Sequence, residues 1–92
     1  MELPVSNNKE QQQFEVHADG ETAVLQYRFH DDVIWLMHTE VPLNLEGKGI
    51  ASALAHYGLE WAKENHKKAK VICPFVAIYL KRHPEYNEIV VR

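Results

Sequence analysis

Two glycines separated by a single residue, Gly47 and Gly49, stand between an apolar run and a helical pattern. Glycine lets the backbone come close to a ligand and adopts dihedral angles that other residues avoid. The first amides of a helix carry partial positive charge, so the segment Asn44–Ala51 could hold a pyrophosphate, with Lys48 adding a charge contact. The same tripeptide also suits a tight turn before a helix, and taken alone it favours the turn.

Cys73 is the one cysteine of the chain, so no disulfide can form within it. It ends a short apolar run and directly precedes Pro74, where a second helix is predicted to begin. A thiol beside a helix N-terminus can gain thiolate character and act as a nucleophile. A buried, unreactive cysteine is the commoner outcome, and strand position alone favours that interpretation.

Alternating patterns predict the strands that must position these groups. Apolar and polar residues alternate over 14–18 and over 23–27, and the turn dipeptide Asp19-Gly20 lies between them, which predicts a β-hairpin. The run 33–39 is apolar on both faces at first, so we place it centrally in the sheet as the third strand of a meander. The polar segment 6–13 is predicted to be a frayed lead-in.

Pro42 ends the third strand, because proline cannot donate to a central ladder. Apolar residues then recur at helical spacing, which predicts a helix over about 47–66. A fourth strand is predicted at 71–73, parallel to a neighbour through the crossover. A second helix follows at 74–82, and residues 89–91 form a last strand or an extended tail.

The predicted order is β-β-β-α-β-α-(β), a compact α+β domain with a mostly antiparallel sheet. The two tryptophans, Trp35 and Trp61, are interpreted as core residues.

Composition limits the function classes. The 92 residues fit one domain, with 1–10 as a flexible lead-in and 11–92 as the folded part. A net charge of −3 argues against a general nucleic-acid or anionic-membrane binder. The single cysteine and the lack of an apolar signal or spanning segment predict a cytoplasmic protein, which we expect to be a monomer or a weak dimer. The histidines show no metal-ligand spacing, so no metal is expected.

The stretch 38–51 resembles the coenzyme A motif of the GNAT N-acetyltransferase superfamily, in which Gln or Arg precedes Gly-x-Gly or Gly-x-Ala by two residues. Asn44 departs from Gln or Arg at the first position. The chain is most similar to the short, single-domain, minimal GNAT-like subfamily. His-Thr-x-Val-Pro, Gly-x-Gly-Ile-Ala, Cys-Pro-Phe-Val and Arg-His-Pro-Glu-Tyr match it in order and spacing, and the match covers residues 14–91.

This resemblance implies a splayed strand pair that holds acetyl-CoA as co-substrate. The pantetheine arm would lie along Thr39, Glu40 and Val41, with the strand 71–73 as the other wall. The pyrophosphate would take amides of the segment 45–51. The cofactor-binding residues implied in that segment are Leu45, Gly47, Lys48, Gly49, Ile50 and Ala51.

Three catalytic candidates follow, His38 from its place beside the predicted splay, Cys73 from its place before a helix together with the resemblance, and Tyr79 from the resemblance. Cys73 would take the acetyl group or contact the cofactor sulfur, although direct transfer needs no protein nucleophile. His38 would accept a proton from the amine, although a structural histidine is the alternative. Tyr79 would protonate the departing thiolate, although an aromatic packing residue is equally consistent with its apolar neighbours.

The function implied is acetyl transfer from acetyl-CoA to a primary amine. The amine-binding elements of larger GNAT proteins are absent, so a protein lysine or N-terminus could approach the cleft. The alternatives are a module that binds CoA or acyl-CoA with little or no turnover, and a structural domain in which Gly-x-Gly is only a turn.

Overall fold

The turn dipeptide Asp19-Gly20 joins β2 (Gln13–Ala18) to β3 (Glu21–His30) in the computed structural model, which describes residues 4–91. Both turn residues have positive φ, 50° at Asp19 and 75° at Gly20, as a tight hairpin requires. β3 then pairs antiparallel with β4 (Val33–Glu40). The predicted hairpin and meander are therefore confirmed.

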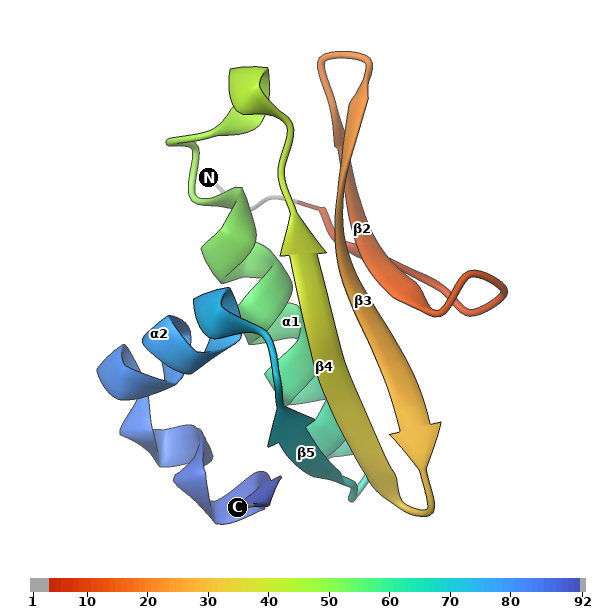
Figure 1. Ribbon diagram of the computed structural model, residues 1–92, viewed down its shortest axis with the longest axis vertical. Coiled ribbons are helices and arrows are strands. Elements are labelled where there is room, and N and C mark those ends of the chain that lie inside the picture. The colour runs from red at the N-terminus through yellow and green to blue at the C-terminus, as the bar shows by residue number, and fades with distance from the viewer. Residues whose placement is uncertain (1–3, 92) are drawn as a thin grey trace.

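The sheet has the strand order β1-β2-β3-β4-β5-β6, antiparallel up to β4 and parallel from β4 to β6 (Figure 1). The predicted α+β class, the central place of β4 and the parallel crossover are confirmed. The remaining elements are β1 (Ser6–Asn8), the 3-10 helix η1 (Leu43–Leu45), α1 (Ile50–Glu64), β5 (Lys68–Val71), α2 (Pro74–Arg82), the 3-10 helix η2 (Pro84–Ile89) and β6 (Val90–Val91).

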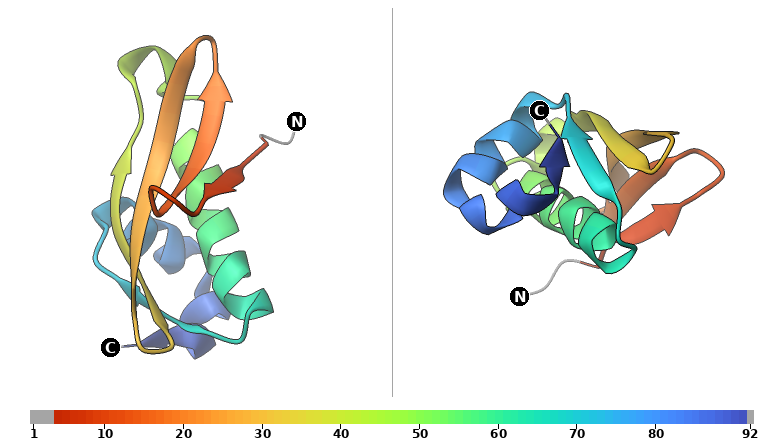
Figure 2. Two further views of the ribbon diagram at one scale, coloured as in Figure 1. Left: turned by 90° about the vertical axis from the view of Figure 1, so that its right-hand side faces the viewer. Right: turned by 90° about the horizontal axis from the view of Figure 1, so that it is seen from below.

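α1 lies across one face of the sheet and leaves the opposite face without a helix, as the left view of Figure 2 shows. Phe14, Leu25 and Leu36 point from the sheet into the core beneath this helix and are fully buried. Gly58 lets α1 approach them, because a Cβ there would stand 3.3 Å from atoms of Leu25 and Phe14. The missing side chain thus sets how closely helix and sheet pack.

Part of the predicted lead-in belongs to the sheet. Residues 6–8 form β1, which pairs antiparallel with the start of β2, whereas residues 1–3 lie outside the described part of the chain. Polar side chains attach β1 to the sheet, since the Tyr27 hydroxyl donates to Asn7 Oδ1 at 2.6 Å and Asn8 Nδ2 donates to Glu15. Apolar periodicity could not reveal a strand held in this way.

The fourth strand was predicted three residues too late. β5 covers Lys68–Val71, and Ile72 and Cys73 follow it outside the strand. Its lysines alternate with Ala69, which is buried under the helices. The lysine stems lie on the helix-free face of the sheet, where their charged ends reach water. Trp35 lies on that face as well, under the ammonium of Lys70, and is half-buried there rather than part of the core.

No helix within residues 4–91 is long and apolar enough to cross a membrane.

Candidate functional site

β4 and β5 separate beyond Leu36. Their parallel pairing ends at Leu36 and Val71, after which the amides of Ile72 and Cys73 both donate to the Leu36 carbonyl oxygen, each at 3.0 Å. β4 nevertheless continues to Glu40, paired with β3. The last residues of β4 therefore face a gap where β5 has turned away.

A β-bulge lies at the same level. The register of β3 and β4 shifts by one between Gln26 and Tyr27, which leaves Met37 as an extra residue on β4. A bulge bends a strand and re-aims the side chains that follow it. Beyond it, Thr39 is buried on the helix side and His38 is exposed on the other side.

The loop before α1 is shaped by its two glycines. Gly47 has φ 81° and Gly49, the N-cap residue of α1, has φ 76°, both in the left-handed region that favours glycine. Leu45 and Ile50 are buried and anchor the loop on both sides. The Gly49 cap has no side chain, so the first amides of α1 are left to water or to a ligand.

A cavity of about 500 Å³ lies between this loop and the end of β4. Every predicted cofactor-binding residue except Lys48 lines it. Sequence reasoning missed Glu46, Ser52 and Phe75, which line it too. The full set is Thr39, Glu40, Val41, Leu45, Glu46, Gly47, Gly49, Ile50, Ala51, Ser52 and Phe75.

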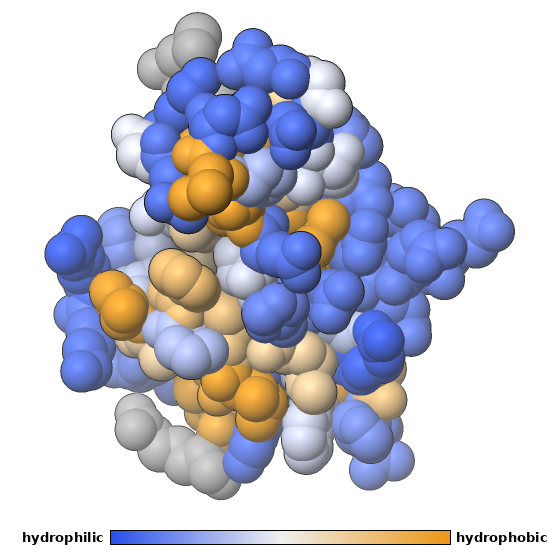
Figure 3. All heavy atoms as spheres, turned by 45° about the horizontal axis from the view of Figure 1, so that its top comes forward, coloured by the Kyte–Doolittle hydropathy of each residue, from blue (hydrophilic) through white to orange (hydrophobic). Residues whose placement is uncertain are grey.

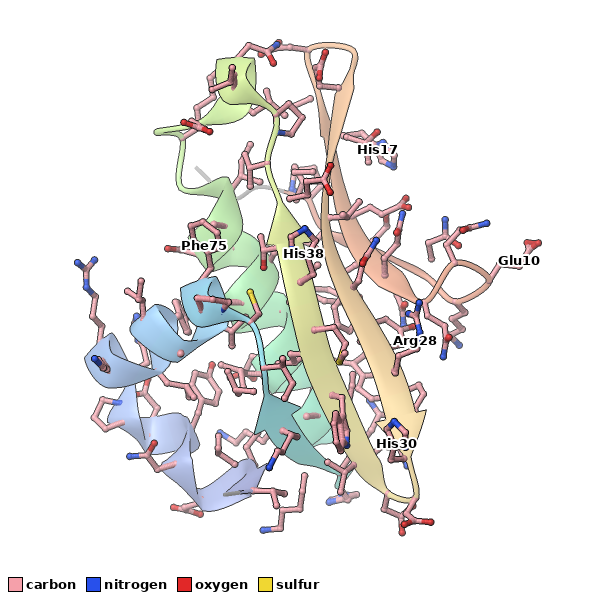
Figure 4. All side chains as sticks on the ribbon, in the orientation of Figure 1. Glu10, His17, Arg28, His30, His38 and Phe75 are labelled. Atoms are coloured by element: carbon pink, nitrogen blue, oxygen red, sulfur yellow. The ribbon has the colours of Figure 1, made fainter. Side chains whose placement is uncertain are left out.

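The rim of the cavity combines polar and apolar side chains. Figure 3, turned so that the top of Figure 1 comes forward, shows apolar residues gathered down the middle of this face, with hydrophilic residues around them. Phe75, in the first turn of α2, lines the cavity and is 55% exposed, although the sequence gives no reason to single it out from Ile78 one turn later. Figure 4 shows it on the side of β4 where α2 begins.

Lys48 binds a carboxylate from another part of the chain. Its Nζ lies 3.1 Å from Oδ2 of Asp19, at the tip of the β2–β3 hairpin. Both side chains are more than half exposed, so the pair contributes little to stability. The ion pair nevertheless keeps Lys48, the only cationic side chain of the loop, near the hairpin tip at the cavity end of the sheet.

Cys73 is completely buried and caps the start of α2, with Pro74 as the first helical residue. Its Sγ lies 3.0 Å from Oγ1 of Thr39, and both atoms are buried. Thr39 lines the cavity, so the thiol stands directly behind the cavity wall. The structure thus brings together Cys73 and Thr39 from the two separated strands.

His38 lies on the opposite side of β4 from Thr39. Its Nε2 is 3.5 Å from Oε2 of Glu40, and its side chain is 58% exposed. In Figure 4 it stands on β4, at the level of the bulge. A group at this position can exchange protons with solvent or with a molecule approaching the helix-free face.

Tyr79 belongs to a separate polar cluster between α1, α2 and η2. Its hydroxyl lies 3.1 Å from Nδ1 of His56, and its ring stacks on His83 with centroids 4.0 Å apart. The Tyr86 hydroxyl contacts the same His56 nitrogen and donates to Glu60. Burial raises the pKa of Tyr79, and burial together with the Glu60 contact raises the pKa of Tyr86. Tyr79 is not among the residues that line the cavity.

The predicted site residues therefore fall into three groups. The cofactor-binding residues other than Lys48 line one cavity, Cys73 stands behind that cavity, and neither His38 nor Tyr79 lines it. Within residues 4–91, no group of three or more His, Cys, Asp or Glu side chains is placed to hold a metal ion.

The chain is similar to known proteins in sequence and in structure. The family model described as GCN5-related N-acetyl-transferase matches residues 13–89. Protein NATD1 of Mus musculus is 35% identical over 85 residues, which cover 89% of this chain and 77% of that protein. Protein NATD1 of Danio rerio is 33% identical over 91 residues, covering 94% and 83% of the two chains.

A solved structure shares the fold. The solution structure of a GCN5-like protein from Staphylococcus aureus aligns with a TM-score of 0.73 and 27% identity, covering 97% of this chain and 88% of that one. The alignment therefore includes the separated strands and the loop before α1.

Proposed function

The chain belongs to the family of GCN5-related N-acetyltransferases, and from that premise we propose that it moves an acetyl group from acetyl-CoA to a primary amine, such as a protein lysine or N-terminus. One observation carries the proposal. β4 and β5 separate beyond Leu36, and the gap leads into a cavity of about 500 Å³ that ends at the N-terminus of α1.

The volume of this cavity and the free amides at the start of α1 suit the pantetheine arm and the pyrophosphate of coenzyme A. Ligand pockets commonly have volumes of about 300–1,000 Å³. The pantetheine arm would lie along Thr39, Glu40 and Val41, where β4 has lost β5 as a neighbour. The pyrophosphate would accept hydrogen bonds from amides of the segment 45–51, at the positive end of α1. Lys48 would then exchange Asp19 for a phosphate.

Acetyl-CoA supplies an activated thioester, and the chain has to position it, accept a proton from the amine and provide a proton to the departing thiolate. As the amine nitrogen bonds to the carbonyl carbon and the carbon–sulfur bond breaks, His38 takes the proton of the amine, directly or through water. Cys73 supports the thioester end from behind Thr39, a role that its complete burial favours over that of an acetyl acceptor. Tyr79 remains the candidate donor to the leaving thiolate, for which its hydroxyl would have to turn away from His56.

A module that binds CoA or acyl-CoA with little turnover is the second candidate function. The observation in its favour is that the three proposed catalytic side chains do not converge. Cys73 is 0% exposed, and the Tyr79 hydroxyl contacts His56 outside the cavity lining. Binding would then need only the loop and the end of β4.

Two measurements test these proposals. Calorimetry with CoA is expected to show binding in the micromolar to low millimolar range, and no binding at millimolar CoA would exclude both functions. Thiol release from acetyl-CoA that depends on an added amine is expected for the transferase. Binding without such release would leave the binding module.

We further propose a cytoplasmic, monomeric or weakly dimeric protein that needs no metal. The single thiol, Cys73, is buried and fits a reducing compartment. Cell fractionation, light scattering and activity in the presence of a chelator test these three statements.

A further inference from the structure

The helix-free face of the sheet carries an ordered distribution of charge. Residues that pair directly across the strands point to the same face. One row on this face contains Glu15, Val24 and Glu40, and the next contains Gln13, Gln26 and His38. The carboxylates of this face thus lie beside His38, at the end of β4 that borders the cavity.

Cationic residues follow farther along the same face. Arg28, Trp35 and Lys70 are in register across β3, β4 and β5, and His30, Val33 and Lys68 form the row beyond them. We name Arg28, His30, Lys68 and Lys70 the basic cluster. They gather around Trp35, with Lys70 Nζ 5.9 Å from its ring centroid and the His30 ring 4.5 Å from it. Figure 4 shows His38, Arg28 and His30 following one another down this face.

The basic cluster has no carboxylate partner among residues 4–91. Arg28 Nη1 donates to the carbonyl of Tyr27 at 2.6 Å, and Lys68 Nζ donates to that of Glu88 at 3.0 Å. The ion pairs of the described chain involve other residues, namely His17–Glu15, His38–Glu40, Lys48–Asp19, Lys67–Asp32 and His83–Glu85. Arg28, Lys68 and Lys70 thus have no ion-pair partner among residues 4–91, although the chain as a whole carries a net charge of −3.

We propose that the basic cluster docks acidic residues of a polypeptide whose amine is acetylated beside His38, an inference that rests on the transferase function proposed above. A strand rises about 3.3 Å per residue, so the Arg28–Trp35–Lys70 row lies about 10 Å from His38, or about three residues of an extended peptide. The acceptor is therefore a polypeptide segment with acidic residues about three to five positions from its amine.

Two features of the face favour this partner over a nucleic acid. Glu40 stands beside His38, where a cationic amine is attracted and a phosphate backbone is repelled. The change from carboxylates near His38 to the cations of β3 and β5 farther along this face complements a segment that itself changes from an amine to carboxylates. A nucleic acid of uniform negative charge would match only the basic cluster and would meet the overall negative charge of the chain.

The test compares short capped peptides that carry a single lysine. In one peptide, glutamates stand about three to five residues from the lysine, and in the other glutamines replace them. We expect the acidic peptide to bind about fivefold more tightly at low salt and to lose this advantage at high salt, as expected for exposed charges. Binding is followed by NMR shifts with CoA present and absent, and acetylation by the initial rate.

The matched variants are R28Q/K70Q and K63Q/K81Q, which remove equal charge, the second pair from exposed positions on α1 and α2. R28Q/K70Q is expected to bind both peptides equally, whereas K63Q/K81Q keeps the preference. The charge reversal R28E/K70E should prefer a lysine-flanked peptide. Such a reversed preference requires a folded protein, so it distinguishes lost docking from a damaged fold.

Equal binding of the two peptides by the wild type would overturn the proposal. So would a single-stranded oligonucleotide that binds the cluster more tightly than the acidic peptide, since the surface would then serve nucleic acid. If the acidic peptide binds through Arg28 and Lys70 but no peptide is acetylated, the docking surface stands and the transferase proposal fails alone.

Discussion

Thr39 Oγ1 and Cys73 Sγ lie 3.0 Å apart, across the point where β4 and β5 separate. Thr39 lies near the end of β4, and Cys73 follows β5 as the N-cap of α2, so this contact joins the two sides of the gap where the strands separate. We therefore expect a substitution of Thr39 or Cys73 to alter the binding or the reaction of a ligand in the cavity.

Removal of the thiol separates a supporting role from a covalent one. We expect C73A to bind CoA nearly as well as the wild type but to have about tenfold lower kcat, a loss of about 1.4 kcal/mol in transition-state stabilisation. C73S, which keeps a partner for Thr39, should recover most of kcat. Steady-state kinetics and calorimetry measure both quantities.

The covalent alternative predicts different results. An acetyl adduct would appear on intact wild-type protein after incubation with acetyl-CoA, and C73S would be as inactive as C73A. Those two observations together would contradict the supporting role.

The glycine loop allows a test with an internal control. Gly49 and Gly20 have nearly the same φ, 76° and 75°, and a Cβ would meet no atom within 4 Å at either position. Alanine in the left-handed region costs about 1–2 kcal/mol, so G49A and G20A should lower Tm to a similar extent. We expect only G49A to weaken CoA binding, by about tenfold, because it alone lines the cavity. Equal CoA affinities of the two variants would argue against a ligand at this loop.

Phe75 and Ile78 form a second matched pair on α2. They are 55% and 54% exposed, but of the two only Phe75 lines the cavity. We expect F75A to weaken CoA binding by about three- to tenfold through lost apolar contact, and I78A to leave it unchanged. Both variants should keep Tm within a few degrees of wild type, because neither side chain is in the core. Calorimetry measures the CoA affinity of each variant, and thermal melts measure its Tm.

The Glu15 carboxylate makes the free energy of unfolding depend on pH in the acid range. Hydrogen bonds from Gln13, with those from Asn8 and His17, hold the pKa of this buried carboxylate below its usual value of 4.5 against the opposing effect of burial. A folded-state pKa below the unfolded one gives stability that is present above pH 4.5 and is lost as pH falls through the folded pKa.

The corresponding experiment is a series of thermal melts from neutral to acid pH. We expect Tm of the wild type to fall below about pH 4.5 and E15Q to show a shallower decline, starting from a lower Tm at neutral pH. E10Q, at an exposed position, serves as the control. An acid profile of E15Q parallel to that of the wild type would show that other groups cause the decline.

The sequence predicts the parts of the fold that follow from apolar periodicity. Phe14, Val16, Ala23 and Leu25 alternate and are buried as expected. β1 and β5 escape this reasoning because the first is held by side-chain hydrogen bonds and the second carries lysines on its helix-free face.

The site divides in a similar way. The Gly-x-Gly spacing predicts the loop, since glycine permits the positive φ that Gly47 and Gly49 adopt there. The resemblance places Thr39 and Cys73 on opposite walls of the gap, but their contact depends on where the two strands diverge and is not predicted from the sequence. Whether Tyr79 faces the cavity depends on the rotation of α2, which is set by its packing against α1 and His56 and is not encoded locally.

The Lys48–Asp19 pair has a consequence for the kinetics of a ligand at this loop. The loop ammonium already has a counter-charge in the free protein, so an arriving pyrophosphate replaces a carboxylate instead of meeting an unpaired cation. For the proposed coenzyme A ligand, the electrostatic gain would be the difference between two ion pairs, so we expect a moderate affinity and fast dissociation. In the proposed transferase, Asp19 would return to Lys48 as the ligand leaves, which restores the same ion pair before the next ligand binds.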